Sequence, residues 1–157
     1  MYCDRKKNVA LVFGSIFIGS IYALLDDEFF AQNNVRLVVK CDRETPFKRP
    51  DVLTIAVPNF SDALFYGDEA KKLVDRIEFI LEAMHKFSKE NPDANVLVHC
   101  MAGENRSALA IGIYLRKYLN KTYEEAKKLL DDANEKRGCR VLWNPSFQTL
   151  LKDYIYK

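Results

Sequence analysis

Residues 96–107 read VLVHCMAGENRS, and the fold can be worked out from this stretch. The apolar run Val96–Val98 is β-branched and too short for a helix, which indicates a buried strand. The residues after Arg106 are apolar with helical spacing to about Leu119, which predicts a helix. A loop that joins a strand to a helix N-terminus directs several backbone N–H groups to one point. The stretch therefore predicts an anion-binding loop.

Three side chains give this loop its chemistry. Gly103 lets the backbone turn without a Cβ clash, and Arg106 offers a planar fork that can hold two oxygens of a phosphate. Cys100 sits at the centre, where the same N–H groups and the helix dipole stabilise negative charge on its sulfur. A thiolate beneath a bound phosphate is a nucleophile aimed at phosphorus. A Cys with an Arg six residues later is weak evidence alone, so the strand, the glycine and the helix around it carry the interpretation.

Strands and helices alternate along the rest of the chain. Strands are predicted at Val9–Phe13, Ile16–Ile18, Val35–Val39, Val52–Val57 and Val96–Val98. Helices are predicted at Ala23–Gln32, Asp68–Phe87, Arg106–Leu119, from a Thr122/Glu125 capping box to Glu135, and from Pro145 to near Tyr156. This order predicts an α/β fold, with a mostly parallel central sheet of about five strands and helices on both faces. Ligands bind such sheets beyond the carboxyl ends of the strands, where the Cys100 loop lies.

The uncharged segment from Val9 to Leu25 has two interpretations. It resembles a signal peptide or membrane anchor, since basic residues precede it. However, a membrane span needs about 20 apolar residues, and Gly and Ser interrupt this run. We therefore expect two buried strands here and no membrane span.

Composition narrows the class of protein. The chain has 157 residues, which suits one domain covering residues 1–157, and its net charge is only +2. This balance argues against a disordered chain or a strongly basic nucleic-acid binder. The four cysteines are far apart, and with two histidines they make no zinc spacing, so we expect no metal and no cofactor. A reduced compartment is the expected location, with the cytoplasm as the first candidate and the nucleus as the second.

The segment from Val98 to Ser107 resembles the signature loop of cysteine-dependent protein phosphatases, specifically the dual-specificity branch. The resemblance extends over most of the chain. Ile16–Ser20 is similar to the family's early strand and turn, and Asn144–Phe147 is similar to the Asn-x-x-Phe stretch that opens its last helix. The resemblance implies the family's α/β fold and favours the strand interpretation of the N-terminal segment.

The resemblance also implies a role for each residue of the loop. Cys100 is expected to be the nucleophile that forms a phosphocysteine, and Arg106 to bind the phosphoryl oxygens. Ser107 is expected to stabilise the thiolate when it leaves. His99 and Asn144 are expected to support the structure without acting as acid or base. The backbone is expected to bind the phosphate through Met101, Ala102, Gly103, Glu104, Asn105 and Arg106.

The general acid is less well defined by the sequence. The family places an Asp on the loop after the strand that Val52–Val57 resembles. Counting along the strand reaches Asn59, which cannot protonate a leaving oxygen. Counting back from the following helix reaches Asp62 instead, with a small insertion. Asp62 is our prediction, and Asp68, a third candidate, is expected to be a helix N-cap.

These features predict a phosphomonoester hydrolase that acts on phosphotyrosine and on phosphoserine or phosphothreonine in proteins. A phosphorylated protein is then the expected partner. The alternatives are an RNA 5′-phosphatase, a phosphoinositide phosphatase, or a weakly active phosphate-binding module. The loop has no Lys to favour a highly phosphorylated inositol, and no basic stripe favours RNA. The phosphate-binding module remains an alternative because the sequence alone does not decide which residue is the general acid.

Overall fold

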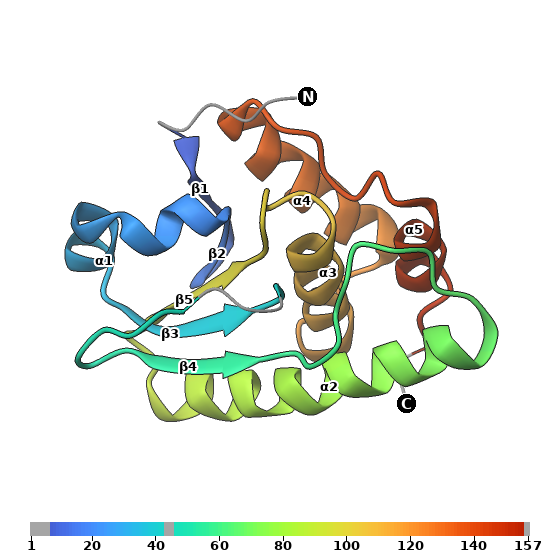
Figure 1. The fold of residues 1–157 in the computed structure, drawn as a ribbon, viewed down its shortest axis with the longest axis horizontal. Helices are drawn as coiled ribbons and strands as arrows, with labels where there is room; N and C mark the ends of the chain where they lie inside the picture. The colour runs from blue at the N-terminus through green and yellow to red at the C-terminus, as the bar shows by residue number, and fades with distance from the viewer. Residues whose placement is uncertain (1–6, 43–45, 156–157) are drawn as a thin grey trace.

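The computed structural model describes residues 7–42 and 46–155 (Figure 1). One sheet contains five strands, β1 (Val9–Phe13), β2 (Ile16–Gly19), β3 (Val35–Lys40), β4 (Leu53–Ala56) and β5 (Asn95–His99). Their order in the sheet is β1-β2-β5-β3-β4; β1 runs antiparallel to β2, and the other neighbours are parallel. The structure thus confirms the mostly parallel sheet and the two strands predicted within the segment from Val9 to Leu25.

Helices cover both faces of the sheet, as predicted (Figure 1). A 3₁₀ turn, η2 (Ile21–Leu25), and α1 (Asp27–Gln32) lie on one face. The other face is covered by α2 (Gly67–Glu90), α3 (Arg106–Tyr118), α4 (Tyr123–Arg137) and α5 (Pro145–Lys152). Each face has its own hydrophobic cluster, so the sheet is buried on both sides.

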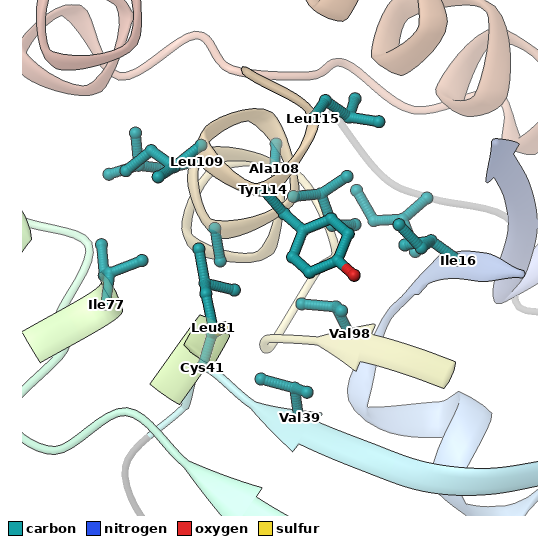
Figure 2. Close-up of a cluster of buried hydrophobic side chains, with 14 of the residues drawn as sticks. Ile16, Val39, Cys41, Ile77, Leu81, Val98, Ala108, Leu109, Tyr114 and Leu115 are labelled. Carbon is teal, nitrogen blue, oxygen red and sulfur yellow. The ribbon is translucent and has the colours of Figure 1, made fainter. Parts of the chain in front are cut away.

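The central strand β5 contributes side chains to both hydrophobic clusters, because successive side chains of a strand point to opposite faces of the sheet. Val96 and Val98 join the cluster beneath α2 and α3, whereas Leu97 joins the cluster beneath α1. All three are fully buried, and each such side chain stabilises the fold by about 1.5–3 kcal/mol. Figure 2 shows Val98 beside Val39 of the neighbouring strand, facing the helices. This packing fixes the end of β5, where the Cys100 loop begins.

The single helix predicted at Ala23–Gln32 is wrong, because η2 and α1 are separate. Asp26 lies between them with non-helical backbone angles (φ −90°, ψ 86°). Its carboxylate accepts a hydrogen bond from the Phe29 N–H at 3.0 Å and so begins a new helix. Composition alone did not reveal this cap.

Two helix ends also differ from the prediction. Tyr66, not Asp68, is the N-cap of α2; Gly67 takes a positive φ of 59° and already begins the helix, which leaves Asp68 in the first turn. At the other end of the chain, α5 stops at Lys152, and Tyr156 lies outside the described residues. Arg116 Nη1 donates to the carbonyls of Leu151, Lys152 and Tyr154, which satisfies the end of this helix.

The predicted capping box is confirmed at α4. Thr122 Oγ1 accepts from the Glu125 N–H at 3.1 Å, and the Glu125 carboxylate accepts from the Thr122 N–H at 2.9 Å. Gly138 ends the helix in the left-handed conformation, with φ 73°. Among the helices of residues 7–42 and 46–155, none has the length and apolar character needed to cross a bilayer.

Candidate active site

Cys100 lies at the carboxyl end of β5, just below the N-terminus of α3. Its side chain is almost entirely buried, with 3% of the residue surface exposed. Its Sγ lies 3.2 Å from Ser107 Oγ, in hydrogen-bond contact. The strand and the helix therefore bring together two of the residues for which a catalytic role was predicted.

The backbone of the loop is held from outside. Four consecutive carbonyl groups, those of residues 101–104, accept hydrogen bonds from other parts of the fold. The pairs are Ile21 N–H to Met101 O (3.0 Å), Arg137 Nη2 to Ala102 O (2.9 Å), Arg137 Nη1 to Gly103 O (2.8 Å) and Leu142 N–H to Glu104 O (2.7 Å). Each carbonyl is thereby directed away from the interior of the loop.

This arrangement fixes where the N–H groups of the loop point. A trans peptide is planar, and its C=O and N–H point in opposite directions. With the four carbonyls directed outward, the N–H groups of residues 102–105 are directed inward. Inward-directed N–H groups next to a helix N-terminus form an anion cradle. The N–H groups of residues 102–105, part of the backbone predicted to bind phosphate, therefore face the interior of the loop, and phosphate binding itself stays a prediction.

Arg137, at the end of α4, is the main clamp on the loop. It is 1% exposed and also donates from Nε to Lys7 O and from Nη1 to Asn134 Oδ1. Burial lowers the pKa of its guanidinium, while Cys100 and Glu104 nearby raise it. Gly103 has φ 70°, and a Cβ there would lie only 2.6 Å from Arg137 Nη1. Glycine is therefore required here by both the backbone angle and the close approach of Arg137.

We expect Arg137→Met to lower the free energy of unfolding by about 1–3 kcal/mol, because the buried Asn134 Oδ1 loses its donor and such a loss costs about 1–3 kcal/mol. Affinity for inorganic phosphate should fall with it, since the Ala102 carbonyl also loses its donor, although Asn134 Nδ2 still holds the Gly103 carbonyl. Urea unfolding and phosphate titration measure the two effects. Arg140→Met is the matched control, because Arg140 is exposed, and should change stability by less than about 1 kcal/mol. If Arg137→Met and Arg140→Met had equal stability and equal phosphate affinity, Arg137 would not be holding the loop.

Arg106 begins α3, a position where a cation is unfavourable unless an anion is near. Its Nη1 lies 3.5 Å from the Phe60 carbonyl, and its buried Nε has no hydrogen-bond partner among the described residues. No acidic residue occupies the first turn of this helix. The guanidinium is thus positioned between the Cys100 loop and the loop that precedes α2.

His99 supports the loop from below, in keeping with its predicted structural role. It is fully buried, and its Nδ1 lies 3.3 Å from the Cys100 carbonyl. Burial lowers the pKa of its imidazole, which favours the neutral ring. Asp42 Oδ1 lies 3.9 Å from Nε2 and partly opposes that shift.

Asp62 is the predicted acid that the structure brings to the loop. Its Oδ2 accepts from Asn105 Nδ2 at 2.9 Å, and its Oδ1 accepts from Asn144 Nδ2 at 2.8 Å. Asn105 belongs to the loop, and Asn144 is the N-cap of α5. A carboxylate has about four lone-pair sites, so two remain for a proton or a substrate oxygen.

Asn144 supports this arrangement with both ends of its side chain. Its Oδ1 accepts from the N–H groups of Ser146 and Phe147, which caps α5, while its Nδ2 reaches Asp62 and the Ala63 carbonyl. Its own N–H donates to Asn105 Oδ1 at 2.9 Å. Asn144 therefore joins the predicted acid loop to the Cys100 loop.

The other two acid candidates lie elsewhere. Asn59 is exposed, has a positive φ of 52°, and its carbonyl accepts from Arg76 Nη2 at 3.0 Å. Asp68 is exposed in the first turn of α2. For neither side chain does the structure give a contact with the Cys100 loop comparable to that of Asp62.

Sequence reasoning missed two residues that shape the loop. Arg137 and Asn134 reach it from α4, and Asn134 Nδ2 donates to the Gly103 carbonyl at 2.8 Å. Both lie near a helix C-terminus, where Arg and Asn are usually exposed. The only local signal is the Arg just before Gly138. Nothing in the sequence shows that it is buried.

A metal-binding cluster is not found in the part of the chain that the structure describes. There, no three His, Cys, Asp or Glu side chains gather in a way that could hold an ion. At the Cys100 loop, Arg106 and the inward-directed N–H groups are donors that can bind an anion.

Comparison with known families gives a match over most of the chain. The model of the dual specificity phosphatase catalytic domain matches residues 16–156. Human dual specificity phosphatase 28 is 28% identical over 141 residues, which cover 89% of this chain and 73% of that protein. A Dictyostelium discoideum protein, named a probable dual specificity protein phosphatase, is 33% identical over 81 residues. That match covers 52% of this chain and 20% of the Dictyostelium protein, so the chain spans about a fifth of its length.

Solved structures agree with the fold. The crystal structure of human DUSP28 has a TM-score of 0.78 and 26% identity, covering 94% of this chain and 92% of that one. The PTP-2 phosphatase of Cydia pomonella has a TM-score of 0.65 and 23% identity, covering 95% of this chain and 94% of that one. The second likeness, at this identity, bears on the fold alone.

Proposed function

Since the chain belongs to the dual specificity phosphatase family, we propose that it hydrolyses phosphate monoesters through a phosphocysteine on Cys100. The observation that carries this proposal is the outward pinning of four consecutive loop carbonyls around the Cys100 thiol. It leaves the N–H groups to bind phosphoryl oxygens directly above the sulfur. Ser107 Oγ, 3.2 Å from that sulfur, completes the arrangement.

The reaction proceeds in two displacements at phosphorus. In the first, the Cys100 thiolate attacks phosphorus, the bond to the leaving oxygen breaks, and Asp62 gives that oxygen a proton. In the second, water attacks the phosphocysteine, Asp62 takes a proton from the water, and the thiolate leaves with inorganic phosphate released. Ser107 stabilises the leaving thiolate by hydrogen bonding. Arg106 and the loop N–H groups neutralise charge on the phosphoryl oxygens in both steps.

For the substrate, we propose phosphotyrosine and phosphoserine or phosphothreonine in proteins. The family supports a phosphoprotein substrate, and the loop carries no Lys for a highly phosphorylated inositol. Turnover of p-nitrophenyl phosphate and of phosphotyrosine, phosphoserine and phosphothreonine peptides tests the proposal. We expect phosphate release from all four. Binding without release would instead favour a phosphate-binding module.

Asp62→Asn tests the acid. Protonation helps most when the leaving oxygen is most basic, and a general acid contributes about 10²–10⁴-fold. We therefore expect a small loss of kcat on aryl phosphates with good leaving groups and a loss of about 10²-fold or more on alkyl phosphates. A series of substrates with graded leaving-group basicity measures the slope.

Asn59→Ala and Asp68→Asn are the matched controls, because both residues are exposed and were the other candidates. Neither should change the slope of the series. An equal, small loss across all substrates in Asp62→Asn would reject Asp62. In that case the hydrogen bonds to Asn105 and Asn144 would be purely structural.

A further inference from the structure

An apolar groove opens beside the Cys100 loop. It has a volume of about 730 Å³ and lies between η2 and residues 46–50. Its apolar lining comes mainly from Ile21, Tyr22, Leu25, Phe47, Pro50 and Met101. Met101 directly follows Cys100 and is the first residue of the phosphate-binding loop, so the groove adjoins the phosphate cradle.

Several of these apolar side chains are unusually exposed for their size. Leu25 is 78% exposed, Met101 is 54% exposed and Tyr22 is 42% exposed. A single exposed apolar residue means little, but a contiguous set lining one groove is typical of a binding surface. Tyr22 and Leu25 come from η2 and Met101 from the Cys100 loop, two segments that the Ile21 N–H to Met101 O hydrogen bond joins. The groove is thus a feature of the fold rather than of one local sequence.

The walls of the groove are fixed by hydrogen bonds and packing. The Ile21 N–H donates to the Met101 carbonyl at 3.0 Å, which ties η2 to the Cys100 loop. On the opposite wall, Arg49 Nη2 lies 2.5 Å from Asp27 Oδ1 and 3.2 Å from the Leu24 carbonyl. The Arg49 guanidinium also stacks over Phe30, 4.2 Å from the ring centroid. A wall held in this way is largely preformed for binding.

Charge at the groove favours an uncharged occupant. Among the described lining residues, Asp27 and Arg49 pair with each other, and Lys48 adds one further positive charge. Binding to an anionic lipid surface needs a cluster of basic residues, and the described lining residues of the groove do not form one. The groove can therefore desolvate an apolar side chain at little electrostatic cost.

We propose that this groove binds a large apolar side chain of the phosphoprotein substrate, one or two residues from the phosphorylated residue. The inference rests on the proposed function and specifies which protein sequences that site accepts. Met101 belongs both to the Cys100 loop and to the groove lining, and an extended peptide advances about 3.3–3.6 Å per residue, so a near neighbour of the phosphorylated residue is the one placed at the groove when the phosphate is in the cradle. Met101 forms the shared edge between the two subsites.

The test uses phosphotyrosine peptides that carry either Leu or the isosteric but polar Asn at each of the two positions on either side. Wild type should prefer Leu at one of these positions by about tenfold in kcat/KM, mainly through KM. Leu25→Asn should reduce this preference to about twofold or less. Leu25 is exposed and outside the phosphate cradle, so p-nitrophenyl phosphate turnover should stay unchanged.

Leu53→Asn is the matched control, because Leu53 is also exposed, at 61%, but lies on β4 away from the groove. It should keep the preference for Leu. Thermal unfolding checks that both variants are folded. Turnover of p-nitrophenyl phosphate with no preference for Leu at any position would overturn the inference alone. The inference would also be overturned if Leu25→Asn lost activity only on phosphoinositide vesicles, because the groove would then contact a lipid surface and not a peptide side chain. No turnover of any substrate would overturn the proposed function, and the inference with it.

Discussion

Cys100→Ser should abolish turnover of p-nitrophenyl phosphate, lowering kcat by roughly 10⁴-fold or more, while leaving affinity for inorganic phosphate nearly unchanged. The serine hydroxyl is not ionised near neutral pH and so is a poor nucleophile at this position. The cradle itself stays intact, because the loop carbonyls are pinned by Arg137, Ile21 and Leu142 rather than by Cys100. Stopped-flow turnover and phosphate titration measure the two quantities.

Cys41→Ser is the matched control for this variant. Cys41 is a free and fully buried thiol at the end of β3, next to the β5 end that carries Cys100. Burial raises the pKa of the Cys41 thiol well above its ordinary value, so it stays protonated and unreactive. Its replacement should change kcat by only a few fold. If Cys100→Ser kept substantial activity, or Cys41→Ser lost as much, the assignment of the nucleophile would be wrong.

Arg106→Lys is expected to lower kcat/KM by roughly 10²–10³-fold, although it preserves the positive charge. An ammonium group cannot make the two-pronged contact with phosphoryl oxygens that a guanidinium makes. The loss should appear in kcat as well as KM, because the charge on these oxygens is redistributed in the transition state. Steady-state kinetics on an aryl phosphate measures both.

The stability of the same variant separates function from structure. A cation at the N-terminus of α3 is unfavourable by about 0.3–1 kcal/mol, so Arg106 does not stabilise the fold through the dipole. Arg106→Lys should therefore keep the free energy of unfolding within about 1 kcal/mol of wild type. Arg36→Lys, at an exposed Arg on β3, should leave both quantities unchanged. Near-normal kcat/KM in Arg106→Lys would contradict the role given to this residue.

The strands and the Cys100 loop were predictable because their signals are local. A short continuous apolar run with β-branched residues indicates a buried strand such as β5, and a capping box such as Thr122/Glu125 satisfies a helix end by itself. The order of strands and helices then predicts a parallel sheet, and with it the edge where the loop lies.

The remaining features depend on contacts between distant segments. Asp26 divides one predicted helix into two, and this became evident only from its hydrogen bond to Phe29. Arg137 looks like an ordinary cation at a helix end, yet it clamps residues that precede it by more than thirty positions. The choice of Asp62 over Asn59 likewise rests on Asn144, far along the chain. Such long-range contacts have no period or spacing that a single sequence reveals.

The measurement that tests the central proposal most directly is quenching of the enzyme in denaturant at alkaline pH during turnover of ³²P-labelled aryl phosphate, followed by peptide mapping at the same pH. The S–P bond of a phosphocysteine hydrolyses readily in mild acid, so the alkaline quench preserves the covalent intermediate of the first displacement. We expect the label on the peptide that contains Cys100, in wild type and not in Cys100→Ser. Label on any other residue, or turnover without covalent label at saturating substrate, would contradict the account.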